Sequence, residues 1–339
     1  MITGGACLLA AATALLVVVH SLLALVFLML VVSAAGTAVA SNALLIDEVS
    51  RRTAVDERGL ASGVIGAGGP AGQLVLAPLV TMAIAMQGWV AALCALGAIA
   101  LLALPLARSF PQRPRRAETP GLVAQSGEAI RDRRFWLIAG SFAMCGFHVS
   151  FLSVHMPGVI ERCGMPASFA GAWLVIAGAA NMAGSVGVGF VMKRFASAPL
   201  LAVVYGLRMV AIAAFVASPQ SGAALLVFAI AIGLTYMSAL PPTAELLART
   251  FGVERLAGLL GATMLVHQVG GFFGAWLGGV AVEHSGGYLP LWIADGALAM
   301  VAATLQLLLM RERRSPPPAR SAARPARWAF AAARGRQSA

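Results

Sequence analysis

Three polar side chains stand seven residues apart within one long apolar run, at Ser141, His148 and His155. Residues at this spacing share one face of an α-helix. Histidine titrates near neutral pH and its ring nitrogens form hydrogen bonds, so this face could contact a small substrate. The histidines could instead bond to backbone carbonyls of a neighbouring helix, and the sequence leaves both interpretations open.

Arg208 lies midway along another apolar run. An arginine there costs roughly 2.5–3.5 kcal/mol on the insertion scale, so it needs a partner or a cavity. It could hold a substrate carboxylate through two hydrogen bonds, and a structural pairing is the slightly favoured alternative. His267 and Gln268 lie mid-run among glycines, where helix packing is expected and substrate contact is the alternative. Glu245 and Asp295 lie nearer the ends of their runs and are expected at the membrane interface.

No grouping of residues predicts enzyme chemistry, a cofactor or a metal site. The histidines lack the HExxH spacing, and no Ser/His/Asp grouping stands out. The four cysteines are scattered singly, at Cys7, Cys94, Cys145 and Cys163. We therefore expect no catalytic residue, no cofactor and no bound metal.

The composition is that of a membrane protein. Hydrophobic residues make up 60% of the 339 and charged residues only 11%, and the mean hydropathy is +0.86. A soluble domain has roughly a quarter of its residues charged. The net charge of +11 does not indicate nucleic-acid binding, because the basic residues cluster beside apolar runs, with eight after Met310 and seven between Arg108 and Arg134.

A helix that crosses the ~30 Å hydrocarbon layer needs about 20 apolar residues. This measure predicts ten transmembrane helices, at 2–19, 21–46, 59–85, 89–107, 135–160, 166–192, 198–217, 222–247, 256–282 and 287–310. Alternate loops, together with the C-terminal tail, hold 22 of the 24 basic residues, whereas the opposite loops hold only Arg162. This asymmetry predicts that both termini are cytoplasmic.

The sequence contains an internal repeat. Three glycines recur at an offset of 198, with Gly63, Gly72 and Gly88 matching Gly261, Gly270 and Gly286. The runs at 198–217 and 222–247 map onto the first two runs of the chain, but 135–160 and 166–192 have no counterpart. We therefore expect a first half of four helices that lacks its first two members, and a second half of six.

Several stretches carry a resemblance to a known family. Gly63–Gln73 contains a Gly-Pro motif, and further similar stretches are 145–158, 181–196, 205–208, 240–243 and 267–279. They resemble the major facilitator superfamily, in particular a bacterial branch related to monocarboxylate and oxalate/formate transporters. The arginine that proton-coupled members carry in their fourth helix is replaced by the apolar stretch 30–32, which puts proton coupling by that route in doubt.

The resemblance implies an all-α membrane protein with two helical halves around a central cavity. It assigns the runs 21–46, 135–160 and 222–247 to cavity-lining helices, so Asn42, Tyr236 and Thr243 join Ser141, His148 and His155 as expected substrate contacts. It further implies a multi-pass protein of the bacterial inner membrane.

The domain organisation predicted on this basis has four parts. Residues 1–108 form the shortened first half, 109–134 a cytoplasmic linker, 135–312 the second half and 313–339 a disordered basic tail. The expected function is secondary transport of a small solute, expected to be a carboxylate, by alternating access. Transport could be coupled to H+ or to a counter-substrate, and the sequence leaves this open. The lipid bilayer is the other expected partner, and nucleic acid is not expected to bind. The alternative is a truncated relic or membrane scaffold without transport activity.

Overall fold

The computed structural model describes residues 2–19, 21–39, 41–105, 127–219 and 221–314, and within these ranges it contains helices and no strand. The helices are α1 (Ile2–Leu15), α2 (Leu22–Val39), α3 (Asn42–Arg52), α4 (Arg58–Leu101), α7 (Arg133–Arg162), α8 (Ala167–Val191), α9 (Ser197–Ala217), α10 (Gly222–Tyr236), α11 (Leu240–Phe251), the short 3-10 helix η1 (Val253–Arg255), α12 (Leu256–Ser285) and α13 (Leu289–Arg314). The predicted disordered tail and most of the predicted linker lie outside the described residues.

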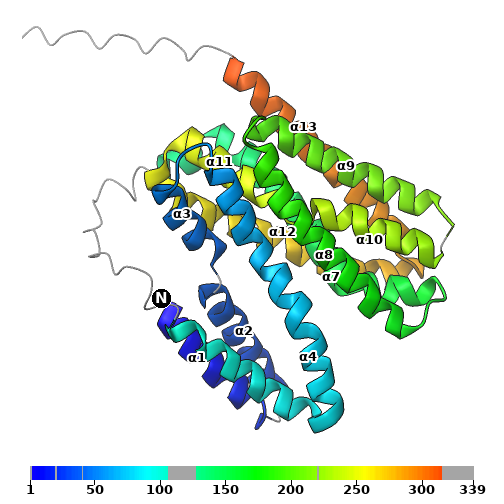
Figure 1. Ribbon diagram of the computed structural model, residues 1–339. Helices are drawn as coiled ribbons and strands as arrows, with labels where there is room; N and C mark the ends of the chain where they lie inside the picture. Colours follow the sequence, from blue (N-terminus) through cyan, green and yellow to red (C-terminus); the bar gives the residue numbers. More distant parts are fainter. Residues whose placement is uncertain (1, 20, 40, 106–126, 220, 315–339) are drawn as a thin grey trace, which may run out of the picture.

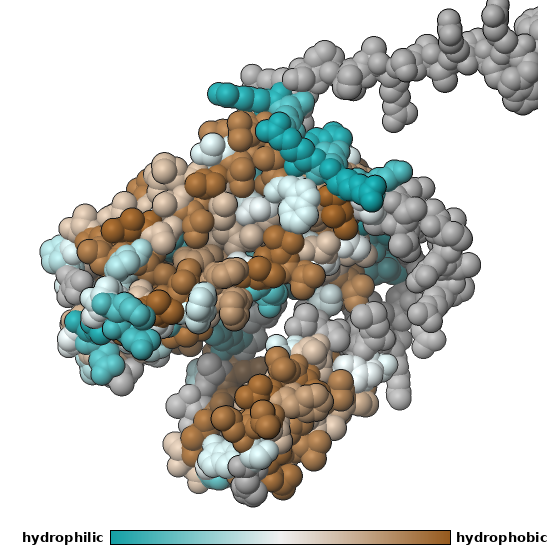
Figure 2. All heavy atoms as spheres, turned by 180° about the vertical axis from the view of Figure 1, so that it is seen from behind, coloured by the Kyte–Doolittle hydropathy of each residue, from teal (hydrophilic) through white to brown (hydrophobic). Residues whose placement is uncertain are grey.

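The predicted all-α membrane architecture is confirmed. Within the described residues, eight helical segments are long and apolar enough to cross a membrane. Two shorter apolar helices, α1 and α2, account for the first two predicted runs. Figure 2 shows apolar side chains over most of the visible surface and hydrophilic side chains gathered at the ends of the bundle, as expected of a protein whose sides face lipid.

The helices form a large bundle and a smaller group (Figure 1). In the bundle, α7 packs against α12 and α13, α9 packs against α13, and α8 packs against α10. The smaller group consists of α1, α2 and the second part of α4. The first part of α4 lies along α8 and connects the two groups.

The helical boundaries repeat at the offset of 198 found in the sequence. α2 and α3 meet around residues 39–42, and α10 and α11 meet around 236–240. Gly88 and Gly286 both adopt positive φ, at 82° and 67°. Gly88 lies at a kink within α4, and Gly286 caps the C-terminal end of α12. Because side chains other than glycine are strained at such φ values, these two turns explain why glycine recurs at both positions.

The sequence predicted one helix over the run 222–247, but the structure has two. The run is interrupted after Tyr236, and α11 begins at Leu240. Pro241 and Pro242 supply the physical reason, because they have no N–H to bond the carbonyls four residues earlier and their rings crowd the preceding turn. The predicted run 21–46 is likewise divided between α2 and α3, where the Ser41 hydroxyl caps the new helix by accepting the Leu44 N–H at 3.4 Å.

Two backbone-to-backbone contacts fix the packing of the bundle. A Cβ placed on Gly270 of α12 would overlap the Ala143 carbonyl of α7, and one on Gly146 would overlap the His267 carbonyl. Gly63, in the first part of α4, also lies against the backbone of Ser185 in α8, whose hydroxyl donates to the Gly63 carbonyl at 2.8 Å. Small residues permit this close approach, which supplies packing where lipid provides no hydrophobic drive.

The α7–α12 contact gives a first prediction. Gly270→Ala should destabilise the protein by about 1–3 kcal/mol, because the added methyl group must push two backbones apart. Gly261→Ala in the same helix is the matched control, since a Cβ there meets nothing within 4 Å. Thermal unfolding of the purified protein in detergent measures both. Equal unfolding midpoints for the two variants would contradict the contact.

Candidate functional site

The interruption between α10 and α11 leaves backbone groups that need hydrogen-bond partners inside the bundle. Arg208 of α9 is the donor to two of the carbonyls. Its Nη2 donates to the carbonyl of Thr235 at 2.6 Å and to that of Tyr236 at 3.4 Å. Arg208 is 1% exposed, and its guanidinium carbon lies 5.6 Å from the centre of the buried Tyr205 ring. A cation at the C-terminal end of α10 also opposes the negative end of the helix dipole. Arg208 is therefore the structural cap of the broken helix.

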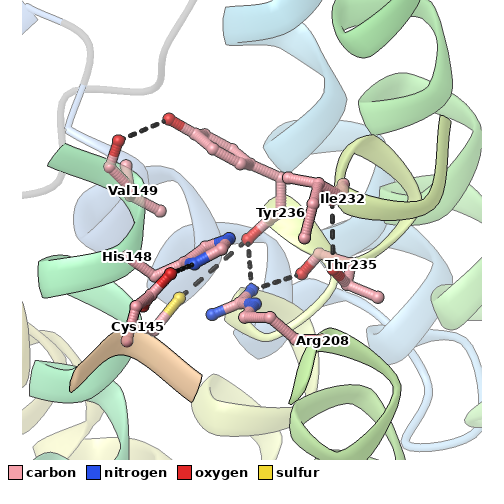
Figure 3. A network of polar contacts seen from close by, with 8 residues as sticks. Cys145, His148, Val149, Arg208, Ile232, Thr235 and Tyr236 are labelled. Carbon is pink, nitrogen blue, oxygen red and sulfur yellow. Dashed lines mark hydrogen bonds and ion pairs between the residues drawn. The ribbon is translucent and has the colours of Figure 1, made fainter. Parts of the chain in front are cut away.

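Asn181 of α8 completes the cap from the other side. Its Oδ1 accepts the N–H of Met237, at 3.0 Å, in the interruption itself. The Tyr236 hydroxyl donates to the carbonyl of Val149 at 2.8 Å and lies 2.7 Å from the hydroxyl of Ser153, so it ties the end of α10 to α7. Figure 3 shows the Tyr236 backbone between Arg208 and Cys145, with the ring directed toward α7.

A cavity of about 340 Å³ lies against this interruption. Its walls come from α7, α8 and α10, with Gln73 reaching in from α4. Ser153, Asn181 and Tyr236 supply its other polar groups, while residues such as Trp173 make the remainder apolar. Among the described residues that line it, none carries a charge. A pocket of apolar walls with a few amide and hydroxyl groups suits a small organic molecule.

His148 does not line this cavity, and its contact with a substrate stays a prediction. Its side chain is 1% exposed, and Nδ1 lies 2.6 Å from Oδ2 of Asp295 on α13. The carboxyl of Asp295, which the sequence places near the end of its run, is 1% exposed too and is therefore enclosed by other helices. Asp295 lies only six residues into α13, but α13 packs against both α7 and α9 and buries that face.

Ser141 and His155 share the face of His148 as predicted, but this face meets other helices instead of the cavity. The Ser141 hydroxyl donates to the Ile138 carbonyl and accepts from Gln306 of α13 at 2.6 Å. Nε2 of His155 lies 2.8 Å from the Ala275 carbonyl of α12. These contacts are the helix-to-helix bonds that the sequence had left as the alternative.

The remaining predicted contacts also lie away from the cavity. Asn42 is the half-buried first residue of α3. Thr243 is 1% exposed, and its hydroxyl donates to the Ala239 carbonyl at 2.7 Å within α11. His267 packs on the Phe142 ring, with the ring centres 4.6 Å apart, and Gln268 is exposed. Of the nine predicted residues, Tyr236 alone lines the described cavity.

The sequence reading missed three polar residues of the cavity, Gln73, Ser153 and Asn181. A signal existed for Asn181, which is the lone amide in the apolar run 166–192. Glu245 is also buried, at 6% exposure, and forms an ion pair with Arg249 one turn later in α11.

The N-terminal end of α7 is held by a cap that precedes the membrane-crossing segment. Oδ1 of Asp132 accepts the Arg134 N–H at 2.8 Å, and its carboxylate binds the Arg134 guanidinium. These hydrogen bonds from Arg134 hold the pKa of Asp132 below its ordinary value. The stabilisation is therefore present above the ordinary pKa of an aspartate and is lost as the pH falls through the lowered value.

Comparison with known proteins identifies the family of the chain. A family model described as Major Facilitator Superfamily matches residues 1–237. The chain belongs to the major facilitator superfamily. The chain is similar to two curated proteins, the uncharacterized MFS-type transporter YcxA of Bacillus subtilis (strain 168) and monocarboxylate transporter 11 of Homo sapiens.

The identity to YcxA is 25% over 275 residues, covering 74% of this chain and 64% of that protein. The identity to monocarboxylate transporter 11 is 30% over 274 residues, covering 75% of this chain and 57% of that protein. The chain thus spans less than two thirds of the length of each of these two relatives.

Solved structures of the superfamily share the fold. The E. coli fucose:proton symporter FucP, in one variant form, matches with a TM-score of 0.69 at 13% identity, over 93% of this chain and 83% of that one. The proton:xylose symporter XylE, bound to 6-bromo-6-deoxy-D-glucose, matches with a TM-score of 0.66 at 14% identity, over 93% and 79%. At these identities the likeness concerns the fold alone.

The cap on α10 gives a second prediction. Arg208→Met should cost about 3–5 kcal/mol of stability, because it removes the partner of two carbonyls and leaves Asp295 without a nearby arginine. Adding Asp295→Asn should recover part of that loss. Arg194→Met, at the exposed end of α8, is the control. Chemical unfolding in detergent measures all three, and equal stability of the Arg208 and Arg194 variants would contradict the capping role.

Proposed function

We propose that this chain carries a small organic solute across the membrane by alternating access. The observation that carries the proposal is the cavity, which lies in a superfamily transporter fold and whose polar groups gather at the interruption of α10 and α11. In carriers, substrate sites commonly lie where a membrane helix is discontinuous, because freed backbone groups and capping side chains can contact a solute there. The cavity lies against the interruption in this way.

The solute class we propose is a small carboxylic acid. The relative named monocarboxylate transporter 11 and the resemblance read from the sequence support this class. The cavity would hold the carboxyl group by hydrogen bonds from the hydroxyl of Ser153 and the amide of Gln73, instead of by a cation. The Tyr236 hydroxyl would join them by turning its one proton from the Val149 carbonyl to the solute. Its apolar walls would contact the hydrocarbon part of the acid.

The contacts of Arg51 support the interpretation that the helical bundle is closed at the end that carries the basic loops. Nη2 of Arg51 donates to the carbonyls of Val253, at 3.0 Å, and Glu254, at 3.3 Å, and so joins α3 to η1. The cavity lies on the opposite side, against the Arg162 end of α7 and the first turns of α8. With both termini in the cytoplasm of a bacterium, as the loop charges predict, this arrangement is outward-facing in the inner membrane.

Uptake into proteoliposomes tests the function directly. The purified chain is reconstituted and given radiolabelled formate, acetate, lactate, pyruvate and oxalate in turn, with glucose as a neutral comparison. Saturable uptake of at least one acid is expected. Uptake of none of these solutes above protein-free liposomes would overturn the proposal and favour the scaffold alternative.

Tyr236 gives a third prediction within the same assay. Tyr236→Phe should weaken apparent affinity for the transported acid by about 2- to 10-fold, the equivalent of one hydrogen bond of about 0.5–1.5 kcal/mol. Tyr288→Phe is the matched control, because Tyr288 lines a different cavity, together with Arg162 and Trp292. If both variants keep wild-type affinity, the Tyr236 hydroxyl does not contact the solute.

Arg51 gives a fourth prediction, on the closed end. Arg51→Gln should lower outside labelling of a Ser153→Cys probe about 2- to 10-fold, since losing bonds that hold the cytoplasmic end shut shifts the population inward. The probe is built with the other accessible cysteines replaced. Arg52→Gln is the control, because Arg52 pairs with Glu48 on its own helix. Unchanged labelling in Arg51→Gln would show that this contact does not bias access.

A further inference from the structure

The buried pair of His148 and Asp295 does not line the cavity described above. Nδ1 of His148 lies 2.6 Å from Oδ2 of Asp295, and each side chain is 1% exposed. An ionised carboxylate only accepts hydrogen bonds, so the imidazole donates from Nδ1. The lone pair of the neutral ring therefore sits on Nε2. That atom is buried and has no hydrogen-bond partner among the described residues.

Further titratable groups are linked to the pair, either directly or through Arg208, and they come from α7, α9, α10 and α12. α9 contributes Arg208 and Tyr205, which interact electrostatically with each other, and Arg208 also interacts with Asp295. α7 contributes Cys145 and α12 contributes His267, which contacts Cys145.

α10 contributes Tyr236, whose ring centre lies 6.4 Å from that of His148. Within the described residues, no hydrogen bond joins Arg208 to Asp295, although Arg208 Nε and Asp295 Oδ1 are both buried without a partner. The pair and Arg208 therefore form one small cluster of ionisable side chains inside the large bundle.

We propose that this pair is a proton-binding site that controls the cap on the broken helix. One proton from water binds Nε2 of His148 and forms one N–H bond. The neutral imidazole becomes an imidazolium, and the charge of the group rises from zero, with Arg208 positive and Asp295 negative, to +1. Asp295 stabilises the imidazolium, whereas Arg208 and burial destabilise it. The surroundings of His148 therefore contain opposing influences on the protonated and the neutral ring.

The geometry connects this proton to the cavity. When His148 is charged, it balances Asp295, and Arg208 remains on the carbonyls of Thr235 and Tyr236 as observed. When the proton leaves, Arg208 is the cation that remains to balance Asp295, and the two unpartnered atoms, Nε and Oδ1, allow a direct bond. That exchange would release the end of α10, which carries the cavity residue Tyr236. Figure 3 shows how closely His148, Arg208 and Tyr236 gather.

Nitrogen-15 NMR of the full chain in lipid bilayers tests the proton site without any transport assay. The chain has five histidines, so the spectrum of ¹⁵N-histidine-labelled protein is simple, and loss of one signal in His148→Gln assigns it. The expected result is that His148 changes from the neutral Nδ1–H form to imidazolium between about pH 9 and pH 5. Asp295→Asn should displace that titration by about 1 pH unit or more, while His284→Gln, outside the group, should leave it in place.

Two results would overturn the site. Either His148 keeps one protonation state across the whole range, or it titrates identically in wild type and Asp295→Asn. Asp295→Asn keeps the size and a hydrogen-bonding side chain, and the wild-type titration needs no variant, so misfolding of His148→Gln would not obscure the answer.

The link to transport rests on the proposed function and has its own measurement. With the acid that is taken up best, Asp295→Asn should abolish accumulation driven by a pH gradient and keep exchange of labelled for unlabelled solute. Glu283→Gln, an acid outside the buried group, should keep both. Wild-type accumulation in Asp295→Asn would overturn the link. Absence of uptake in every protein would instead overturn the proposed function, and the NMR titration would still decide the proton site.

Discussion

The constraint on which this structure depends is that no water is available in the membrane interior to bond a free peptide group. The proline pair at 241–242 breaks a membrane-crossing helix, so the groups at the break must find partners from other helices. Arg208 reaches them from α9 and Asn181 reaches them from α8. Each partner constrains a neighbouring helix, and the packing of α8, α9 and α10 follows from this one interruption.

The same requirement explains why polar groups gather on both sides of the break. On one side, Asn181 and the Tyr236 ring form part of an uncharged cavity. On the other side, the buried Arg208 brings a full charge into the interior, where a charge is costly without a counter-charge. Asp295 supplies that charge and holds His148 in turn. A pocket for a solute and a buried titratable group therefore share a single short stretch of backbone.

The sequence predicted the architecture well because lipid imposes a length and a composition on every span. It predicted that Ser141, His148 and His155 share a face, which α-helical geometry determines by itself. It could not predict what lies opposite that face, because the neighbour depends on the packing of α12 and α13 against α7. For the same reason, Asp295 was placed at the interface: counting residues from a span end measures depth and ignores burial by other helices.

The contact between Gly63 and Ser185 has a mechanical consequence. It joins the first part of α4 to α8 backbone to backbone and lies much closer to one end of α8 than to the other, with 18 residues on the Ala167 side and six on the Val191 side. At 1.5 Å per residue these arms measure about 27 Å and about 9 Å. If the contact acts as a fulcrum, a given tilt sweeps the cavity end of α8 roughly three times as far as the basic end. The two ends of the bundle would then open by different amounts, widely at the Ala167 end of α8 and narrowly at the Val191 end.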